Sequence, residues 1–305
     1  MSAKTDLFIR LKYLNAAVNL PALIDQGIAQ SEHNGVANLL RKGLGIVAFN
    51  ILEDFIKNKS IESLAALSNS RLPFNDLTDF LQESAISGAL NALVFNSNIQ
   101  KRDGADWKAL IQDEALKIHS TKNGTYELSK FSLVYNGSNV SLPEITDLLR
   151  AFGLNGGWAL MKTISDKIGG GLPDLNQAYR NASSRRHNAA HTASFQYDYL
   201  WISNIKSEIL TIAAVLDILL TARCRQVTAI PSKKMDTYDI NAALNFRFLE
   251  PKNNIFRETT TIGGNSRKNW PDIQNAINYL QPLLKNKDEF LVVLNPSKRI
   301  EDWYV

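Results

Sequence analysis

The chain has 305 residues, 45% of them hydrophobic, and a formal net charge of +4. This length is typical of two domains, or of one domain with an extension, and the apolar share is enough for a packed core. A single cysteine, Cys224, excludes a disulfide framework and a cysteine-based zinc site. The first 13 positions carry charged residues and predict no signal peptide, and Glu208 and Asp217 interrupt the longest apolar stretch. We therefore expect a soluble cytoplasmic protein that does not span a membrane.

The net charge is unevenly distributed. The stretch from Arg223 to Val305 holds 13 basic and 9 acidic residues, and the rest of the chain is balanced. All of the basic excess therefore belongs to the C-terminal part. Two interpretations stay open: this part gathers RNA electrostatically, or it is an ordinary solvated surface.

The first part of the chain predicts helices. Residues 7–29 are expected to form short helices broken at Pro21. Residues 31–57 predict a strong helix, because their apolar side chains recur at helical spacing. Glu53 lies on the apolar stripe of that helix, where a carboxylate without a partner is unfavourable to bury. Either Glu53 orients an arginine of an active site, or it is a boundary residue whose carboxylate reaches water.

The middle of the chain predicts further helices and one small β insertion. The helices are expected at residues 73–93, 106–119, 143–152 and 158–168. Residues 126–135 are rich in β-branched and aromatic side chains and precede a turn signal, Asn136-Gly137, so a small strand or hairpin is expected near residues 125–140. Three successive glycines, residues 169–171, lack the lysine–serine pair of a phosphate-binding loop and predict a flexible hinge.

The pattern changes again towards the C-terminus. Residues 199–225 predict a long buried helix. Beyond Pro231 we expect strands at residues 246–249, 259–262 and 290–294, and a helix at 271–284 with its proline near the first turn. The predicted organisation is a helical segment over residues 1–29, a mainly α domain over 30–228, and a small α/β extension over 229–305.

The chain concentrates reactive side chains in one short stretch, residues 180–191. This stretch holds Arg180, Arg185 and Arg186 and two of the four histidines, His187 and His191, and no carboxylate occurs between Asp174 and Asp198. A cationic turn that carries imidazoles, mounted ahead of a long core helix, is suited to hold a phosphodiester. The alternative is a charged helix end that contacts only water or a neighbouring helix dipole.

The spacing between Arg186 and His191 is five residues. On an ideal helix this spacing places the two side chains about 140° apart, so they cannot project from one stripe. Either the motif straddles the start of a helix, or each of the two residues meets partners from a second subunit.

The motif Arg186-His187-Asn188-Ala189-Ala190-His191 resembles the signature of the HEPN superfamily, in which an arginine and a polar residue precede a histidine. Residues 41–55 resemble the first long helix of that domain, and the resemblance covers about residues 30–225, most closely the RiboL-PSP and MAE-type branch. It implies an antiparallel helical bundle and a metal-independent endoribonuclease of toxin–antitoxin or phage-defence systems that acts as a homodimer. A sister group has a tyrosine, modified by a partner enzyme, two positions after the histidine. This chain has Ala193 there, so that switch is expected to be absent or different.

Cleavage of RNA without a metal needs a base for the ribose 2′-OH, a cation for the charge that grows on the phosphorus, and an acid for the leaving 5′-oxygen. Histidine exchanges protons near neutral pH, and arginine grips phosphate oxygens with a planar fork. We therefore expect His191 to transfer protons and Arg186 to clamp the phosphate. Arg185, His187 and Asn188 are expected helpers, and Arg180 either holds RNA or caps the turn.

We expect no metal and no cofactor. His187 and His191 have the i, i+4 spacing of a ligand pair, but no third ligand lies nearby and three arginines would repel a cation. Two other functions stay open beside the nuclease. One is a non-catalytic RNA-binding or scaffold module of the HEPN type, and the other is a toxin controlled by a partner antitoxin.

Overall fold

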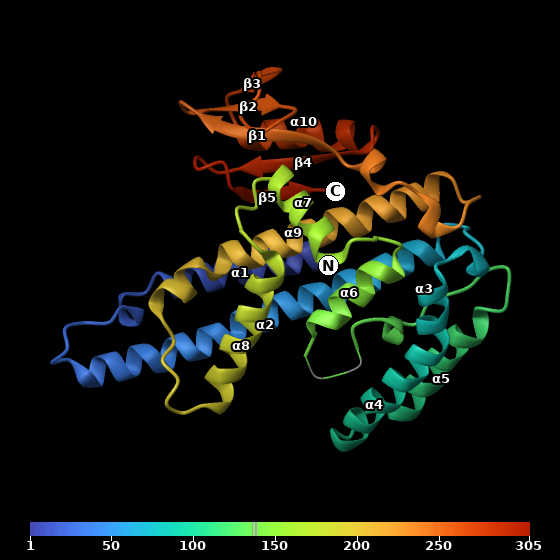
Figure 1. Cartoon of the computed structure of the whole chain (residues 1–305), viewed down its shortest axis with the longest axis horizontal. Coiled ribbons are helices and arrows are strands. Elements are labelled where there is room, and N and C mark those ends of the chain that lie inside the picture. The colour runs from blue at the N-terminus through green and yellow to red at the C-terminus, as the bar shows by residue number, and fades with distance from the viewer. Residues whose placement is uncertain (136, 138) are drawn as a thin grey trace.

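The computed structural model describes residues 1–135, 137 and 139–305. The structure is mainly helical, with one small sheet in the C-terminal part (Figure 1). The helices are α1 (Ala3–Val18), α2 (Ser31–Ser68), α3 (Asp79–Glu83), α4 (Ala89–Arg102), α5 (Trp107–Ser120), α6 (Leu142–Ala151), α7 (Gly157–Lys167), α8 (Leu175–His191), α9 (Tyr199–Ala229) and α10 (Ile273–Lys285). The strands are β1 (Asn245–Lys252), β2 (Ile255–Thr259), β3 (Lys268–Trp270), β4 (Glu289–Leu294) and β5 (Ile300–Tyr304).

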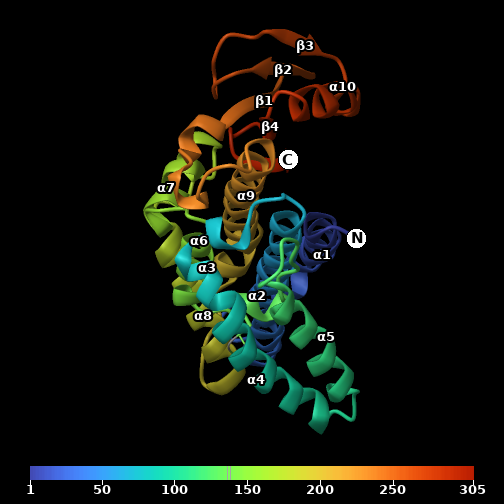
Figure 2. The same cartoon turned by 90° about the vertical axis from the view of Figure 1, so that its right-hand side faces the viewer.

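The two longest helices, α2 and α9, form the centre of the molecule and cross it side by side (Figures 1 and 2). They run in the same direction, because Arg41 contacts Tyr197 just before α9 begins, whereas Lys59 contacts Asp217 further along both helices. Helices α1 and α8 run against α2. For α1 the contacts Ala3–Glu62 and Arg10–Asp54 show this, and for α8 the contacts Phe49–Tyr179 and Lys42–Thr192. The bundle is therefore mixed, and its central pair is parallel where an antiparallel arrangement was expected.

By length and composition α2 is the one described helix that could cross a membrane. In this structure it is the central helix of the bundle, and it packs against α1, α8 and α9. It extends to Ser68, eleven residues beyond the predicted end, because Ser63, Leu64 and Leu67 continue the buried face.

Most of the predicted helices are present, with shifted ends. The N-terminal segment is one helix, α1, followed by a short 3-10 turn at Pro21–Leu23, rather than several short helices. The helix predicted at 73–93 begins later, with α3 at Asp79. It then continues through a π-helical turn, Ser84–Gly88, into α4. The apolar pattern predicts helix here, but it does not reveal the change from α- to π-type hydrogen bonds at Ser84–Gly88.

The predicted β insertion is wrong for the described residues. Residues 126–135 form an irregular segment with one 3-10 turn, Lys130–Ser132, and Asn136 of the predicted turn lies outside the described residues. The aromatic and branched side chains Tyr126, Leu128 and Leu133 are buried in the helical core. A composition rich in such residues reflects burial as much as strand pairing, and here burial accounts for it.

The sheet has the strand order β3-β2-β1-β4-β5, in which β1 and β4 are parallel and the other neighbours are antiparallel. The strands predicted at 246–249 and 290–294 and the helix α10 are confirmed. The strand predicted at 259–262 is wrong except for Thr259, which is the last residue of β2. Strands β3 and β5 were not predicted. Pro271 precedes the N-cap residue Asp272 rather than lying in the first turn.

The C-terminal part shares the core of the helical body. One face of the sheet packs on α10, whereas Phe248, Phe290, Val292 and Trp303 on the other face belong to the same buried cluster as α9. The three glycines at 169–171 do not form an open hinge. A Cβ atom on Gly170 would lie 2.2 Å from Ser165 Oγ, and Gly169 accepts a hydrogen bond from Ile300 N, so the glycines allow close packing of this turn against α9 and β5.

One buried ionic group joins α2, α9 and the sheet. Asp217 lies in the middle of the apolar helix α9, with its side chain 3% exposed. Its carboxylate pairs with the Lys59 ammonium at 2.6 Å and accepts hydrogen bonds from Thr221 Oγ1 and from Trp303 Nε1 at 2.7 Å. A carboxylate and an ammonium buried at this depth are tolerated because each satisfies the other.

We expect Asp217→Leu to lower the free energy of unfolding by about 3–5 kcal/mol, because it leaves the buried Lys59 ammonium with only the more distant Glu62 carboxylate, at 3.8 Å. The double variant Lys59→Met/Asp217→Leu is expected to recover most of that loss, since it buries no charge. Urea unfolding of the wild type, both single variants and the double variant measures the coupling. If the loss of unfolding free energy in the double variant equals the sum of the losses in the two single variants, the pair has no coupling energy.

Candidate functional site

The motif lies at the C-terminal end of α8 and not in a turn. The helix begins after Asp174, whose carboxylate accepts a hydrogen bond from Gln177 N at 3.0 Å. It then continues without a break through His191, and Thr192 leaves the helix with an extended backbone. The expectation that the motif straddles a helix start is therefore wrong, because Arg186 and His191 belong to the same helix.

Burial along α8 divides the motif between two sides. Tyr179 and Ala182 are buried against the core, and Arg186 follows on that side of the helix, half-buried. The Arg186 Nε atom is buried and has no hydrogen-bond partner among the described residues. His187 and His191 are exposed. Within one chain, the structure thus keeps the expected phosphate clamp apart from the expected proton-transfer residue, as the 140° spacing requires.

The two histidines form a pair on the exposed side of α8. Their ring centroids are 4.8 Å apart and the rings are tilted by 50°. Arg180 is also exposed, and on a regular helix it shares their stripe, because it precedes His187 by seven residues and His191 by eleven. Two imidazoles within reach of one small group, with a guanidinium two turns away, are a suitable set for proton transfer at a bound anion.

Glu53 belongs to α2 and is buried in the core, close enough to α8 for the charge of Arg186 to act on it. It is 5% exposed, and its carboxylate accepts a hydrogen bond from Val140 N at 2.5 Å, so the expectation that it reaches water is wrong. Burial raises the pKa of the Glu53 carboxyl above its ordinary value, although the Val140 hydrogen bond and the charges of Lys57 and Arg186 lower it. The charge of Arg186 therefore acts on Glu53, but no direct contact joins the two side chains.

Arg185 has a structural partner that the local sequence does not reveal. Its guanidinium donates to Glu208 Oε2 at 2.7 Å and to Asn181 O at 3.1 Å, and the residue is 8% exposed. Glu208 comes from α9, 23 residues later in the chain. The absence of carboxylates between Asp174 and Asp198 therefore does not leave all three arginines free, because a carboxylate from a distant segment neutralises one of them.

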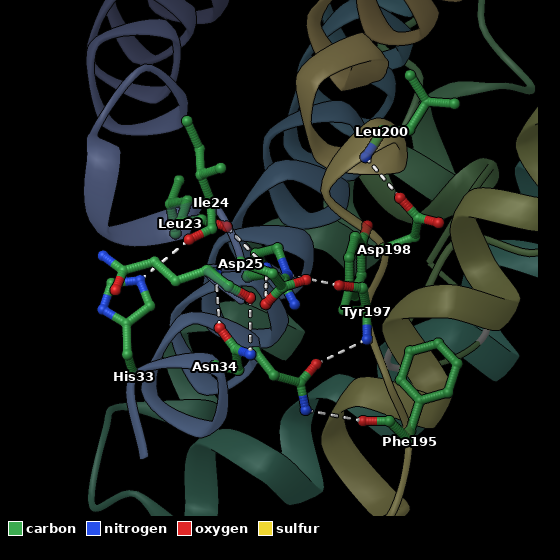
Figure 3. Close-up of polar contacts among 12 residues, drawn as sticks. Leu23, Ile24, Asp25, His33, Asn34, Phe195, Tyr197, Asp198 and Leu200 are labelled. Atoms are coloured by element: carbon green, nitrogen blue, oxygen red, sulfur yellow. Dashed lines mark hydrogen bonds and ion pairs between the residues drawn. The ribbon is translucent and has the colours of Figure 1, made fainter. Parts of the chain in front are cut away.

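The loop between His191 and α9 is held by α2. The Asn38 amide donates to Phe195 O at 3.2 Å and accepts from Tyr197 N at 2.7 Å, and Arg41 Nε donates to Tyr197 O at 2.6 Å (Figure 3). Lys42, one helical turn after Asn38, donates from Nζ to Ala193 O at 2.7 Å. Three side chains on one face of a rigid helix thus set the backbone that follows the histidines.

The same loop needs a glycine on α2. A Cβ atom on Gly45 would lie 2.4 Å from the Tyr197 ring, so only glycine lets that ring press against the helix. Arg41 also donates to Leu23 O at 2.7 Å and to Asp25 Oδ1 at 3.0 Å, which ties the N-terminal connection to the same point (Figure 3). Sequence reasoning missed Asn38, Arg41 and Lys42, although their i, i+3, i+4 spacing was a visible signal.

A hollow of about 370 Å³ opens beside the motif, between α8 and the start of α9. Larger hollows, about 900 Å³ beside α5 and about 700 Å³ beside β1, lie away from the motif. Among residues 1–135, 137 and 139–305, no group of three or more His, Cys, Asp or Glu side chains is arranged to hold a metal ion.

Comparison of the chain with protein-family models, with curated proteins and with solved structures gives no match.

The raised pKa of Glu53 predicts a pH dependence of stability. The folded state binds the proton more tightly than the unfolded chain, so the contribution of Glu53 to stability falls as pH rises from its ordinary pKa of 4.5 through the folded value. In Glu53→Gln this dependence is absent. We therefore expect the difference in unfolding free energy, wild type minus variant, to increase as the pH is lowered from 7.5 to 4.5.

Urea unfolding at four or five pH values across that range measures the difference. Glu32→Gln is the control, because Glu32 is an exposed carboxylate near the start of the same helix. A difference for Glu53→Gln that stays constant with pH, like that of the control, would contradict the assignment of a buried carboxyl that resists ionisation.

Proposed function

We propose that this protein is a metal-independent endoribonuclease of the HEPN type, a cytoplasmic toxin or defence effector that cuts RNA by attack of the ribose 2′-OH. The observation that supports the proposal most strongly is the exposed pair His187–His191, with ring centroids 4.8 Å apart, at the end of a helix that also presents Arg180. The resemblance of residues 186–191 to the HEPN signature supplies the reaction class. The small C-terminal sheet has no role in this proposal.

In the proposed reaction His191 accepts the proton of the 2′-OH, and the 2′-oxygen attacks the adjacent phosphorus. The bond to the 5′-oxygen breaks, and a second imidazole donates a proton to that leaving group. His187 is the nearest second imidazole, one helical turn before His191. Arg186 remains the phosphate clamp of the proposal, with Arg180 and Asn188 as helpers on the exposed side.

The placement of Arg186 supports a site made by two chains. Because α8 is continuous, Arg186 and His191 project about 140° apart from one helix. This separation supports the arrangement in which each of the two residues meets partners from a second subunit. Around a two-fold axis near the end of α8, Arg186 of one protomer would face His191 of the other, and the same contact would repeat symmetrically. We therefore propose a homodimer with the motif at its interface.

A second candidate is an RNA-binding or scaffold module without cleavage. It is favoured by the same inward placement of Arg186, since a single chain presents imidazoles and Arg180 but not the complete set for cleavage. Control by an antitoxin or another defence partner is a further part of the proposal, and it rests on the resemblance alone.

We expect the purified protein to cleave single-stranded RNA at an unchanged rate in EDTA and to leave a 2′,3′-cyclic phosphate and a 5′-hydroxyl. His191→Ala is expected to reduce the rate at least about 100-fold, because it removes the proton-transfer group. An RNA with 2′-deoxyribose at the cut should not be cleaved, since it lacks the nucleophile. Gel separation and end-group analysis of a labelled RNA provide the measurement.

His119→Ala is the matched control, since His119 is an exposed histidine on α5, outside the motif. Loss of cleavage in EDTA with recovery in Mg²⁺, or full activity of His191→Ala, would contradict the mechanism.

The homodimer predicts complementation between two inactive variants. We expect His191→Ala and Arg186→Met to be inactive alone, and the mixed proteins to recover about a quarter of the wild-type activity. Half of the randomly mixed dimers pair the two variants, and each such dimer has one intact site of two. Methionine is chosen for Arg186 because the stem of this side chain is half-buried and must be replaced by an apolar group.

Light scattering gives the mass, and a tag on one variant verifies that subunits exchange. A monomer that cleaves at the full rate would contradict the two-chain site. So would exchanged dimers that show no recovery of activity.

A further inference from the structure

The hollow beside the motif has the composition of a site for a planar polar ligand. It is lined by Asn181, Ser184, Arg185 and Asn188 of α8, by Phe195 of the loop, and by Trp201 and Glu208 of α9. Its volume, about 370 Å³, lies in the range of small-molecule sites. Neither histidine lines the hollow, but Asn188 at its edge precedes His191 by three residues, about 4.5 Å along the helix and about 60° around it.

One wall of the hollow is aromatic. The Phe195 and Trp201 rings are close to parallel, with an interplanar angle of 21° and centroids 6.3 Å apart. Tyr197 supports Trp201 edge-on at 5.9 Å. Trp201 is nevertheless 39% exposed, a large fraction for a tryptophan held by two other rings. An exposed indole that is fixed in place offers a stacking surface at little further loss of conformational entropy.

The other walls offer hydrogen-bonding groups that the fold does not use. Among the described residues, no hydrogen bond reaches the side chains of Ser184 and Asn188. Asn181 Oδ1 accepts from Gln177 Nε2, which leaves its amide nitrogen available. Glu208 binds Arg185 through Oε2 and keeps Oε1 as an acceptor.

The ion pair Arg185–Glu208 in the hollow is largely buried. Arg185 is 8% exposed, and its guanidinium lies 5.7 Å from the centroid of the Trp201 ring. Burial raises the pKa of the Glu208 carboxyl above its ordinary value, and the charge and hydrogen bond of Arg185 lower it in part. A carboxylate in such a place gains from any N–H donor that a ligand brings to its free oxygen.

We propose that this hollow binds one unpaired base of a single-stranded RNA. The base stacks on Trp201 and Phe195, its polar edge meets Asn188, Ser184 and Glu208, and its phosphodiester lies at the His187–His191 pair. Sequence-selective proteins bind single-stranded RNA in this way, with splayed bases on aromatic or guanidinium planes and hydrogen bonds to the base edges. A duplex cannot enter, because its bases are stacked and paired.

The inference rests on the proposed function in that it takes RNA as the ligand, but binding of the base does not require cleavage. Trp201 is a positioning residue, since it would hold the substrate and would not contact the atoms that react. The hollow accordingly predicts an effect on binding and on KM that is larger than the effect on the chemical step.

The test measures binding of a fluorescein-labelled, unstructured RNA of twelve nucleotides by anisotropy, in the His191→Ala background so that no cleavage interferes. Trp201→Ala should weaken binding at least about five-fold, because stacking of one base contributes about 1–3 kcal/mol. Trp201→Phe should restore most of the affinity. Leu200→Ala is the matched control, since Leu200 is 63% exposed on the neighbouring position of α9 and does not line the hollow. The corresponding duplex should bind at least about five-fold more weakly than the single strand.

A second measurement uses the unmutated hollow and so does not depend on how the Trp201 variants fold. Single-stranded RNA with 4-thiouridine is irradiated on the His191→Ala protein, and the crosslinked peptide is sequenced. We expect crosslinks within residues 181–188 or 195–208, the two segments that line the hollow. Crosslinks elsewhere, equal binding of Trp201→Ala and Leu200→Ala, or equal binding of duplex and single strand would each overturn the proposal.

The outcomes separate this inference from the proposed function. If binding depends on Trp201 but the wild type does not cleave RNA, the hollow stands and the nuclease does not. If the wild type cleaves RNA and its KM is unchanged in Trp201→Ala, the nuclease stands and the hollow is not its base site.

Discussion

The structure depends on one buried carboxylate, Asp217, placed in the middle of an otherwise apolar helix. An ionised group there is stable only with its partners, so α9 must bring it to Lys59 of α2 and to Trp303 of β5 at the same time. A shift of α9 by one turn along α2 would move Asp217 away from both partners and leave the Lys59 ammonium and the Trp303 indole without it. The charge allows one register, and it attaches the last strand of the sheet to the same point.

The register of α9 in turn decides what stands beside the motif. Asp217 sets the middle of the helix, and the contacts of Arg41 with Tyr197 O set the residue just before its start. Between these two points lie Trp201 and Glu208, which face α8. A displacement of α9 by one turn would separate Glu208 from Arg185 and would close or remove the hollow. The geometry of the proposed site is thus a consequence of buried contacts far from it.

Periodicity predicted the long elements and failed where pairing partners are remote. The central helices, α10, β1 and β4 have strong apolar patterns, and these were found with shifted ends. Residues 126–135 have the composition of a strand, but their aromatic side chains are buried against helices and the segment has no partner strand in the described part of the chain. The short strands β3 and β5 carry too few apolar residues to be recognised before their neighbours are known. The parallel direction of α2 and α9 follows from the path of the chain between them, which no local pattern encodes.

The candidate site shows the same division between local and remote information. The sequence identified residues 180–191 correctly as a concentration of cations and imidazoles, and its angular argument correctly separated Arg186 from His191. It could not show that Glu208 neutralises Arg185, that Glu53 is buried against Val140, or that α2 holds the loop after His191, because each of these contacts spans 23 residues or more. It also treated the motif as a turn ahead of the core helix. In the structure the motif belongs to α8, with Arg186 half-buried and His191 exposed.

The inward placement of Arg186 has a physical reason of its own. A guanidinium half-buried near Glu53 reduces the unfavourable energy of that buried carboxyl, and the attraction between the two charges favours the core side of α8 for Arg186. A residue held in this way is pre-oriented and loses little conformational entropy when an anion approaches it, unlike an arginine that moves freely in water. The regular helix places Arg186 about 140° around α8 from His191. The homodimer proposed above depends on this separation, because a second copy of α8 would present its own histidines to the face that carries Arg186.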